Sequence, residues 1–267
     1  MKALAIRLAD RVGIVAIVAI FVLPWLWMAS LAFKSRSEIF RLPPQLLFPV
    51  TGDNFYIAFL TKGFDADLAN TFVVAGMSAS IAMLVGVPAA FAISRSAKKL
   101  DQIFFFVLTT RMLPPIAIVL PLFLVLSDIG LVKSVWGIVL VHSAANVSLV
   151  VLLMRSFFDR IPLEVDEAAQ IDGASIREVL IGNVIPLAVG GVVLTGFVAF
   201  LLSWNEFFFA SVLTTVENRT LTVAVPGLVT PHGTYWGQVA AVGTVATIPS
   251  LIGLWLLWMF VAHRKSA

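Results

Sequence analysis

Six apolar stretches, each long enough to cross a bilayer, limit what this chain can fold into more than any other feature. A membrane-spanning helix needs about 20 mostly apolar residues, and four of the six stretches hold no charged residue. Backbone groups in lipid must bond within the chain, and no alternating pattern typical of a β-barrel is present, so helices are expected. The expected spans are 12–33, 68–93, 102–126, 134–154, 184–213 and 238–262.

The composition agrees with an integral membrane protein. Only 12% of the residues are charged and 60% are hydrophobic, whereas a soluble domain carries about 25% charged residues. The chain has no cysteine, which excludes disulfides, thiolate metal sites and a cysteine nucleophile. No pair of His, Asp or Glu has metal-ligand spacing. The predicted fold class is all-α, a polytopic membrane helical bundle that forms a single transmembrane domain over residues 1–267.

The distribution of Lys and Arg predicts the orientation, because cytoplasmic loops carry an excess of these residues. Of the 18 Lys and Arg residues, an N-terminus inside places eleven inside and six outside, with Arg111 left within the third stretch. Both termini and the loop 155–183 are therefore expected in the cytoplasm. The first stretch is longer than a signal-peptide core, so it is expected to be an uncleaved helix. The inner residues are Lys2, Arg7, Arg11, Arg95, Lys98, Lys99, Arg155, Arg160, Arg177, Arg264 and Lys265.

The loop 155–183, between the fourth and fifth spans, is polar. Nine of the chain's 18 basic and 15 acidic residues lie in positions 155–182, which indicates that this segment lies in water. Pro162 fits the first turn of a helix, and Gly173 fits the left-handed conformation that ends one. Ser175 and Glu178 form the S-x-x-E pattern of a capping box. The pattern predicts a helix, a glycine corner and a second helix.

The first of these helices is expected to have one face with small side chains, called here the low face. Val165, Ala168, Ala169 and Asp172 follow helical spacing, and the two alanines leave room for a partner to approach closely. The alternative is an amphipathic loop that rests on its own bundle.

The same loop resembles the EAA signature of binding-protein-dependent ABC importer permeases. The resemblance rests on Glu167-Ala168-Ala169, on Gly173 and on Pro186. The fuller pattern E-A-A-x-x-D-G-A is similar to the carbohydrate-uptake branch, the maltose-type inner-membrane subunits. Asn70-Thr71, Pro114-Pro115, Pro121 and Trp204-Asn205-Glu206-Phe207 extend the resemblance along the chain.

Two features depart from that family pattern. Asn183 and Ile185 stand where the signature usually has Ile and Leu, which puts the local packing in doubt. The chain ends at 263–267 without the glycine-rich tail of many maltose-type subunits, so no tail contact with an ATPase is expected.

The resemblance implies the function. The chain would be the transmembrane permease subunit of an ATP-driven importer that moves a carbohydrate or polyol across the bacterial inner membrane by alternating access. The family's signature loop is a coupling helix in a cleft of a cytoplasmic ATPase. This implies that Glu167 pairs with a basic ATPase residue and that Gly173 holds the corner. The further residues carried over to this contact are Ala168, Ala169, Asp172 and Ala174.

The resemblance also implies the partners. They are a second homologous permease, which would form a heterodimer, two ATP-binding subunits and an extracytoplasmic solute-binding protein. The sequence lacks a G-x-x-x-x-G-K-[ST] phosphate loop. The chain is therefore expected to be no enzyme and to bind no cofactor, with ATP and Mg on the ATPase.

Several polar residues within the apolar stretches are candidates for the substrate path. Arg111 at mid-span costs roughly 2.5–3.5 kcal/mol to insert, and Pro114-Pro115 frees backbone carbonyls at the same depth. Either Arg111 and Pro114 line the path, or Arg111 is paired at a subunit interface. Asn205 and Glu206 fit a path, a fixed interface or a binding-protein contact.

Other polar residues in the spans favour structural roles. His142 and Asn146 share a helical face, and an interhelical hydrogen bond is expected for them. Asn70 is expected to cap the second span.

Three other classes of protein are alternatives to this function. An ABC importer permease for another solute, such as a sugar phosphate or an amino acid, fits the same signature. A stand-alone secondary transporter or channel lacks support, because the sequence shows no inverted repeat and few buried carboxylates. A membrane enzyme fits least, because no nucleophile–base or paired-carboxylate arrangement is present.

Overall fold

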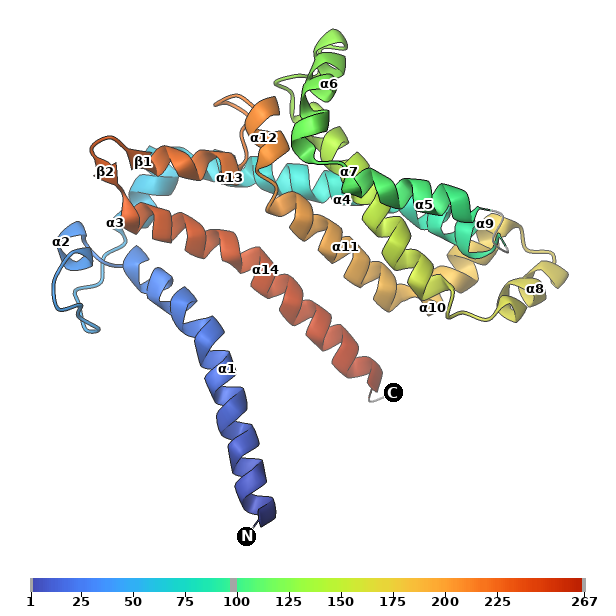
Figure 1. Cartoon of the computed structure of the whole chain (residues 1–267), viewed down its shortest axis with the longest axis horizontal. Coiled ribbons are helices and arrows are strands. Elements are labelled where there is room, and N and C mark those ends of the chain that lie inside the picture. The colour runs from blue at the N-terminus through green and yellow to red at the C-terminus, as the bar shows by residue number, and fades with distance from the viewer. Residues whose placement is uncertain (1, 97–99, 266–267) are drawn as a thin grey trace. The chain divides into compact units, whose positions relative to one another are not determined.

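The computed structural model describes residues 2–96 and 100–265, with side chains described for 11–96 and 100–260, and this part is almost wholly helical (Figure 1). Lys98 and Lys99, which are counted among the basic residues expected on the cytoplasmic side, lie outside the described residues. The α-helices are α1 (Lys2–Ala32), α2 (Arg36–Ile39), α3 (Asp53–Phe55), α4 (Phe64–Ser94), α5 (Asp101–Thr109), α6 (Pro115–Asp128), α7 (Val135–Phe158), α8 (Leu163–Ile171), α9 (Ile176–Glu178), α10 (Ile185–Leu187), α11 (Val189–Trp204), α12 (Phe208–Leu213), α13 (Leu221–Ala224) and α14 (Trp236–Lys265).

Short segments of tighter or wider helix and one hairpin complete the described elements. The segments are η1 (Tyr56–Thr61), η2 (Thr110–Met112), η3 (Val179–Val184) and η4 (Val225–Leu228). Strand β1 (Val229–Thr230) pairs antiparallel with β2 (Gly233–Thr234), with Val229 opposite Thr234. The all-α fold class predicted from the sequence is confirmed.

Four helices are long and apolar enough to cross a membrane, within the part of the chain that the structure describes. They cover 11–32, 64–94, 135–158 and 236–260. Two further candidates are bent pairs, 101–112 with 115–128 at 98° and 176–187 with 189–204 at 85°, which brings the total to six if each pair is one span. The first bend follows from the expected proline interruption, because Leu113 and Pro114 are extended, with ψ of 125° and 131°.

The segment 184–213, predicted as one span, is divided in the structure. Helical structure runs from residue 176 to 187, bends at Ala188, and continues as α11 only to Trp204. A separate short helix, α12, follows at Phe208. The break between α11 and α12 has a physical cause, because the Glu206 carboxylate accepts the N–H groups of Phe209 and Ala210 in the first turn of α12 and so favours the start of a new helix.

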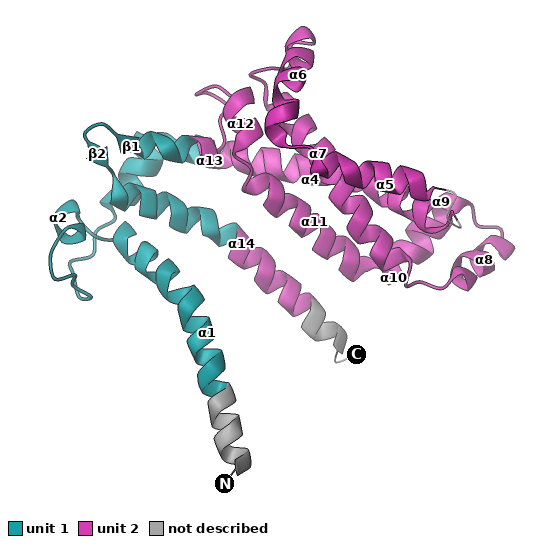
Figure 2. Cartoon of the chain, viewed as in Figure 1, with its two compact units in different colours: residues 1–66, 224–249 teal, residues 67–223, 250–267 magenta. Residues whose placement is uncertain are grey.

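The sequence predicts one transmembrane domain, and the structure divides the chain into two compact units (Figure 2). Unit 1 comprises residues 1–66 and 224–249, and unit 2 comprises 67–223 and 250–267. In unit 1, Ala32 from α1 and Ala240 and Ala241 from α14 form a small buried cluster. The apolar window of α1 at 11–32 is otherwise unburied.

Unit 2 has its core between α4, α7 and α11. Lipid tails are as apolar as leucine, so helices in a membrane associate mainly where small residues let their backbones approach closely. Gly86 on α4 is such a point, because a Cβ there would lie 2.6 Å from Cγ1 of Val150 on α7.

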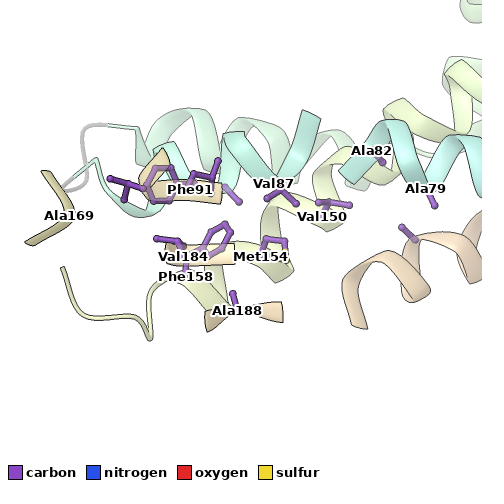
Figure 3. Close-up of a cluster of buried hydrophobic side chains, with 14 residues drawn as sticks. Ala79, Ala82, Val87, Phe91, Val150, Met154, Phe158, Ala169, Val184 and Ala188 are labelled. Carbon is purple, nitrogen blue, oxygen red and sulfur yellow. The ribbon is translucent and has the colours of Figure 1, made fainter. Parts of the chain in front are cut away.

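One buried cluster of unit 2 extends from these helices to the polar loop (Figure 3). Phe91 of α4 and Phe158 of α7 meet edge to face, with ring centroids 6.0 Å apart. Ala169 of α8 and Val184 of η3 belong to the same cluster. The loop is therefore packed against the bundle and does not hang free from it.

Candidate functional site

The polar loop folds as a helix, a glycine corner and a second helix, as the sequence predicts. Pro162 occupies the N-cap of α8, one position before the predicted first turn. Gly173 has a φ of +90°. Its N–H donates to the Gln170 carbonyl at 3.0 Å, and the Ala174 N–H donates to the Ala169 carbonyl at 2.9 Å. These two bonds are the Schellman arrangement that ends a helix at a left-handed glycine.

The predicted capping box is confirmed at the start of α9. The Ser175 hydroxyl accepts a hydrogen bond from the Glu178 N–H at 3.4 Å, and the Glu178 carboxylate accepts one from the Ser175 N–H at 2.7 Å. The box fixes the direction in which the chain leaves the corner.

The faces of α8 differ from the prediction. Ala169, expected on the low outer face, is 8% exposed and belongs to the core, and Asp166 is also buried. These two residues are three apart and lie on one face. The outward side carries Glu164, Glu167 and Ala168, all exposed. The alternative of a loop that rests on its own bundle therefore describes the inner face of α8, and a partner has access only to the outer one.

The outer side of the loop carries exposed apolar residues. Leu163 is 53%, Ile171 85% and Ile176 70% exposed. We call Leu163, Glu164, Glu167, Ala168, Ile171 and Ile176 the outer loop face. Apolar side chains rimmed by carboxylates on an otherwise polar loop are typical of a protein contact surface.

Arg95 at the C-terminal end of α4 holds α8 in this orientation. Its Nε donates to Asp166 Oδ2 at 2.6 Å, and its Nη2 lies 3.4 Å from Asp166 Oδ1. From the sequence, Arg95 counts only toward the excess of basic residues on the cytoplasmic side. No local pattern pairs these two residues, which lie 71 positions apart in the sequence.

A second polar cluster joins α4, α7 and α11 within the apolar spans. His142 Nδ1 lies 2.7 Å from the Ser203 hydroxyl, which in turn lies 2.8 Å from the Ser78 hydroxyl. The Asn146 amide donates to the Ala199 carbonyl at 3.2 Å. The predicted interhelical hydrogen bonds of His142 and Asn146 are confirmed.

Glu206 is part of the same cluster. One carboxylate oxygen lies 3.0 Å from His142 Nε2, and the two oxygens accept the N–H groups of Phe209 and Ala210 at 3.0 and 3.1 Å. The neighbouring Asn205 donates from its amide to the Leu201 carbonyl at 2.8 Å. Both predicted path residues thus bond to their own chain.

Arg111 and Pro114 lie at the bend between α5 and α6. Both are exposed, Arg111 in η2 and Pro114 at the N-cap of α6. Within the described residues no ion pair of Arg111 is present.

The structure corrects the prediction for Asn70. Helix α4 begins at Phe64, so Asn70 is not the cap of this span. Its amide donates instead to the Arg219 carbonyl at 3.3 Å, which links α4 to the segment before α13. Helix α4 extends six residues further toward the N-terminus than Asn70 and includes Phe64, Asp65 and Asp67.

Comparisons with known proteins agree along most of the chain. Residues 82–264 match the family described as binding-protein-dependent transport system inner membrane component. The trehalose/maltose transport system permease protein MalG of Thermococcus litoralis is 29% identical over 98% of this chain and 95% of that protein. The inner membrane ABC transporter permease protein YcjP of Escherichia coli is 27% identical over 98% and 96% of the two chains. The sulfoquinovosyl glycerol transport system permease protein SmoH of Agrobacterium fabrum is 28% identical over 86% and 81%.

A solved structure is also similar. It is a chain of a bacterial ABC transporter involved in the import of the acidic polysaccharide alginate, with a TM-score of 0.78 and 23% identity. The likeness covers 97% of this chain and 96% of that one, and it supports the fold.

Proposed function

The chain belongs to the family of binding-protein-dependent transport system inner membrane components, and we propose that it translocates a carbohydrate or polyol across the cytoplasmic membrane by alternating access. One observation carries the proposal, the similarity over 98% of the chain to a permease named for trehalose and maltose. The sulfoquinovosyl glycerol permease is a second relative whose name includes a sugar derivative.

The outer loop face is our proposed contact with a cytoplasmic ATPase. Ile171 and Ile176 would enter an apolar cleft, while Glu167 would pair with a basic residue of the ATPase. This fits their exposure, since side chains on the outer side of α8 have no role in the core of the chain. Gly173, Ala174 and Asp172 would set the angle of the corner between α8 and α9.

We further propose the assembly around this chain. A second, homologous permease would complete the translocation path, two ATP-binding subunits would hold ATP and Mg, and an extracytoplasmic binding protein would deliver the solute. The family name supports the binding protein. In this arrangement the chain catalyses no reaction, and both of its termini lie in the cytoplasm.

Arg111 and Pro114 are our proposed contribution to the path. An exposed arginine in an apolar segment must face water or another protein once the chain is in a bilayer. The 98° bend beside it contains Pro114 and Pro115, which lack the N–H groups that would bond carbonyls of the preceding turn, and such carbonyls would suit sugar hydroxyls. Asn205 and Glu206 are less suited, because both already bond to the chain itself.

The test is uptake by the whole transporter in proteoliposomes. The permease pair and its ATPase would be reconstituted with ATP and Mg inside and the binding protein outside, and entry of labelled maltose, trehalose and glycerol-linked sugars would be followed. We expect entry of at least one of these solutes that needs both ATP and the binding protein. Uptake driven by an ion gradient without ATP would identify a secondary transporter. ATP-driven entry of an amino acid alone would identify the importer of another solute.

A further inference from the structure

Arg95 joins three helices at the loop end of unit 2. Its guanidinium binds the Asp166 carboxylate of α8 through Nε at 2.6 Å, while Nη1 donates to the Phe158 carbonyl of α7 at 3.1 Å. Arg95 itself directly follows α4, which ends at Ser94. A single side chain therefore connects the ends of α4 and α7 to the loop helix.

The contacts use chemistry that only arginine offers. The planar guanidinium presents several N–H donors in a fixed fork, which can meet a carboxylate and a third acceptor at the same time. Phe158 supplies one of the carbonyls that the end of a helix leaves without an intrahelical partner. A lysine ammonium would reach one of these partners with a poorer geometry.

Neighbouring contacts stiffen the same junction. Ser94 donates to the Asp159 carboxylate at 2.5 Å, which ties the end of α4 to the residue after α7. The Arg95 guanidinium also lies 5.7 Å from the centroid of the Phe91 ring, which packs on Phe158. The ends of α4 and α7 thus form one firm body at this point.

The pair is largely withdrawn from water. The side chain of Arg95 is 13% exposed and that of Asp166 is 7% exposed. A buried ion pair adds little net stability, but removal of one partner leaves an uncompensated charge and disrupts the site. Such pairs specify one arrangement, and here that arrangement is the seat of α8 on α4 and α7.

We propose that Arg95 is a positioning residue of the transport cycle, which holds α8 to α4 and α7 so that a displacement of α8 by the ATPase moves these two spans. The inference rests on the proposed function and adds a route for the motion. Asp166 and Ala169 attach the inner face of α8 to the bundle, and the outer loop face stays free for the ATPase. Without the Arg95 bond, α8 would shift on the bundle and the spans would follow it less.

The experiment compares uptake with ATP hydrolysis in proteoliposomes that contain the full transporter. The test variants are Arg95→Gln, Arg95→Lys and Asp166→Asn, and Asp101→Asn is the matched control. Asp101 also forms an ion pair with an arginine, Arg155 at 2.8 Å, which is more exposed, joins α5 to α7 and does not involve α8.

We expect the solute taken up per ATP hydrolysed to fall roughly tenfold in Arg95→Gln and Asp166→Asn, with ATP hydrolysis retained. Arg95→Lys should lie between these variants and the wild type, and Asp101→Asn should match the wild type. Exchange of the two charges, Arg95→Asp with Asp166→Arg, should recover part of the ratio.

Two results would overturn the proposal. One is an unchanged ratio in Arg95→Gln and Asp166→Asn, and the other is an equal fall of the ratio in Asp101→Asn. If Arg95→Gln yields no assembled complex, the solute taken up per ATP hydrolysed by Arg95→Lys serves as the test, and an unchanged value would overturn the proposal. Failure of the proposed function would give a different result, because the wild-type transporter itself would then show no ATP-dependent sugar uptake.

Discussion

At Gly173 the chain adopts a backbone conformation that other residues resist. Its φ is +90°, and a Cβ built there would have no atom within 4 Å. A substitution therefore meets no clash, and its whole cost is backbone strain, about 1–2 kcal/mol for an ordinary residue. Asparagine tolerates this region better than alanine, and β-branched residues tolerate it least.

We therefore expect a graded response at Gly173. Gly173→Asn should bind the ATPase nearly as well as the wild type, and Gly173→Ala should bind it less well. Gly173→Val should weaken ATPase binding most, by roughly tenfold or more, because its backbone strain is about 1–2 kcal/mol or above. The measurement is the affinity of the purified ATPase for the permease in nanodiscs. The amount of each variant in the membrane fraction shows whether it is inserted. Equal affinity across the series would exclude a role of the corner in docking.

Arg111 has two possible roles, one in the substrate path and one at the interface between the two permeases, and a substitution distinguishes them. Its side chain is exposed within an apolar segment and carries no ion pair among the described residues. If it faces the path, Arg111→Ala should lower sugar uptake severalfold while the permease pair still assembles, and Arg111→Lys should retain part of the uptake. Co-purification of the two permeases is the decisive control. Loss of the pair in Arg111→Ala would assign the residue to the interface instead.

Among the elements, the break between α11 and α12 depends on one carboxylate. Glu206 caps α12 through two backbone N–H groups and bonds to His142 of α7. Glu206→Ala would leave these buried donors without an acceptor, at a cost of about 1–3 kcal/mol. We expect a lower melting temperature of the purified complex for Glu206→Ala and little change for Asn205→Ala, because the Asn205 bond is exposed.

A double substitution tests whether Glu206 and His142 act together. Residues in one hydrogen-bond network show non-additive effects on stability. His142→Ala should therefore lower the melting temperature less in the Glu206→Ala background than in the wild type. Strict additivity would show that the two side chains stabilise the break independently.

The loop elements were predictable where the signals were local. Ser175 and Glu178 are three residues apart, and Gly173 requires only its own backbone angles, so the box and the corner follow from adjacent residues. The bond from Arg95 to Asp166 spans 71 positions. Nothing near either residue in the sequence indicates this bond, so the sequence does not predict that Ala169 faces the core.

At the scale of the whole chain, the six apolar segments correspond to four long helices and two bent helix pairs within the part that the structure describes, and hydropathy alone shows neither bend. The third segment contains Pro114-Pro115, which forecast its break. The fifth contains no proline at Asn205–Phe207, and its break depends on Glu206 together with His142 of another helix. A break that needs a partner from another helix leaves no signal in the hydropathy of its own segment.

The orientation of the chain can be tested directly because it contains no cysteine. Single cysteines at exposed positions, Ser37→Cys before the second span and Gln170→Cys on α8, would report which side of the membrane each loop occupies. With a membrane-impermeant maleimide on right-side-out spheroplasts, Ser37→Cys should react at once. Gln170→Cys should react only after permeabilisation, because the excess of Lys and Arg predicts a cytoplasmic loop 155–183. The opposite pattern would place α8 outside the cell, where no ATPase could bind it, and would remove the basis of the coupling proposal and of the role assigned to Arg95.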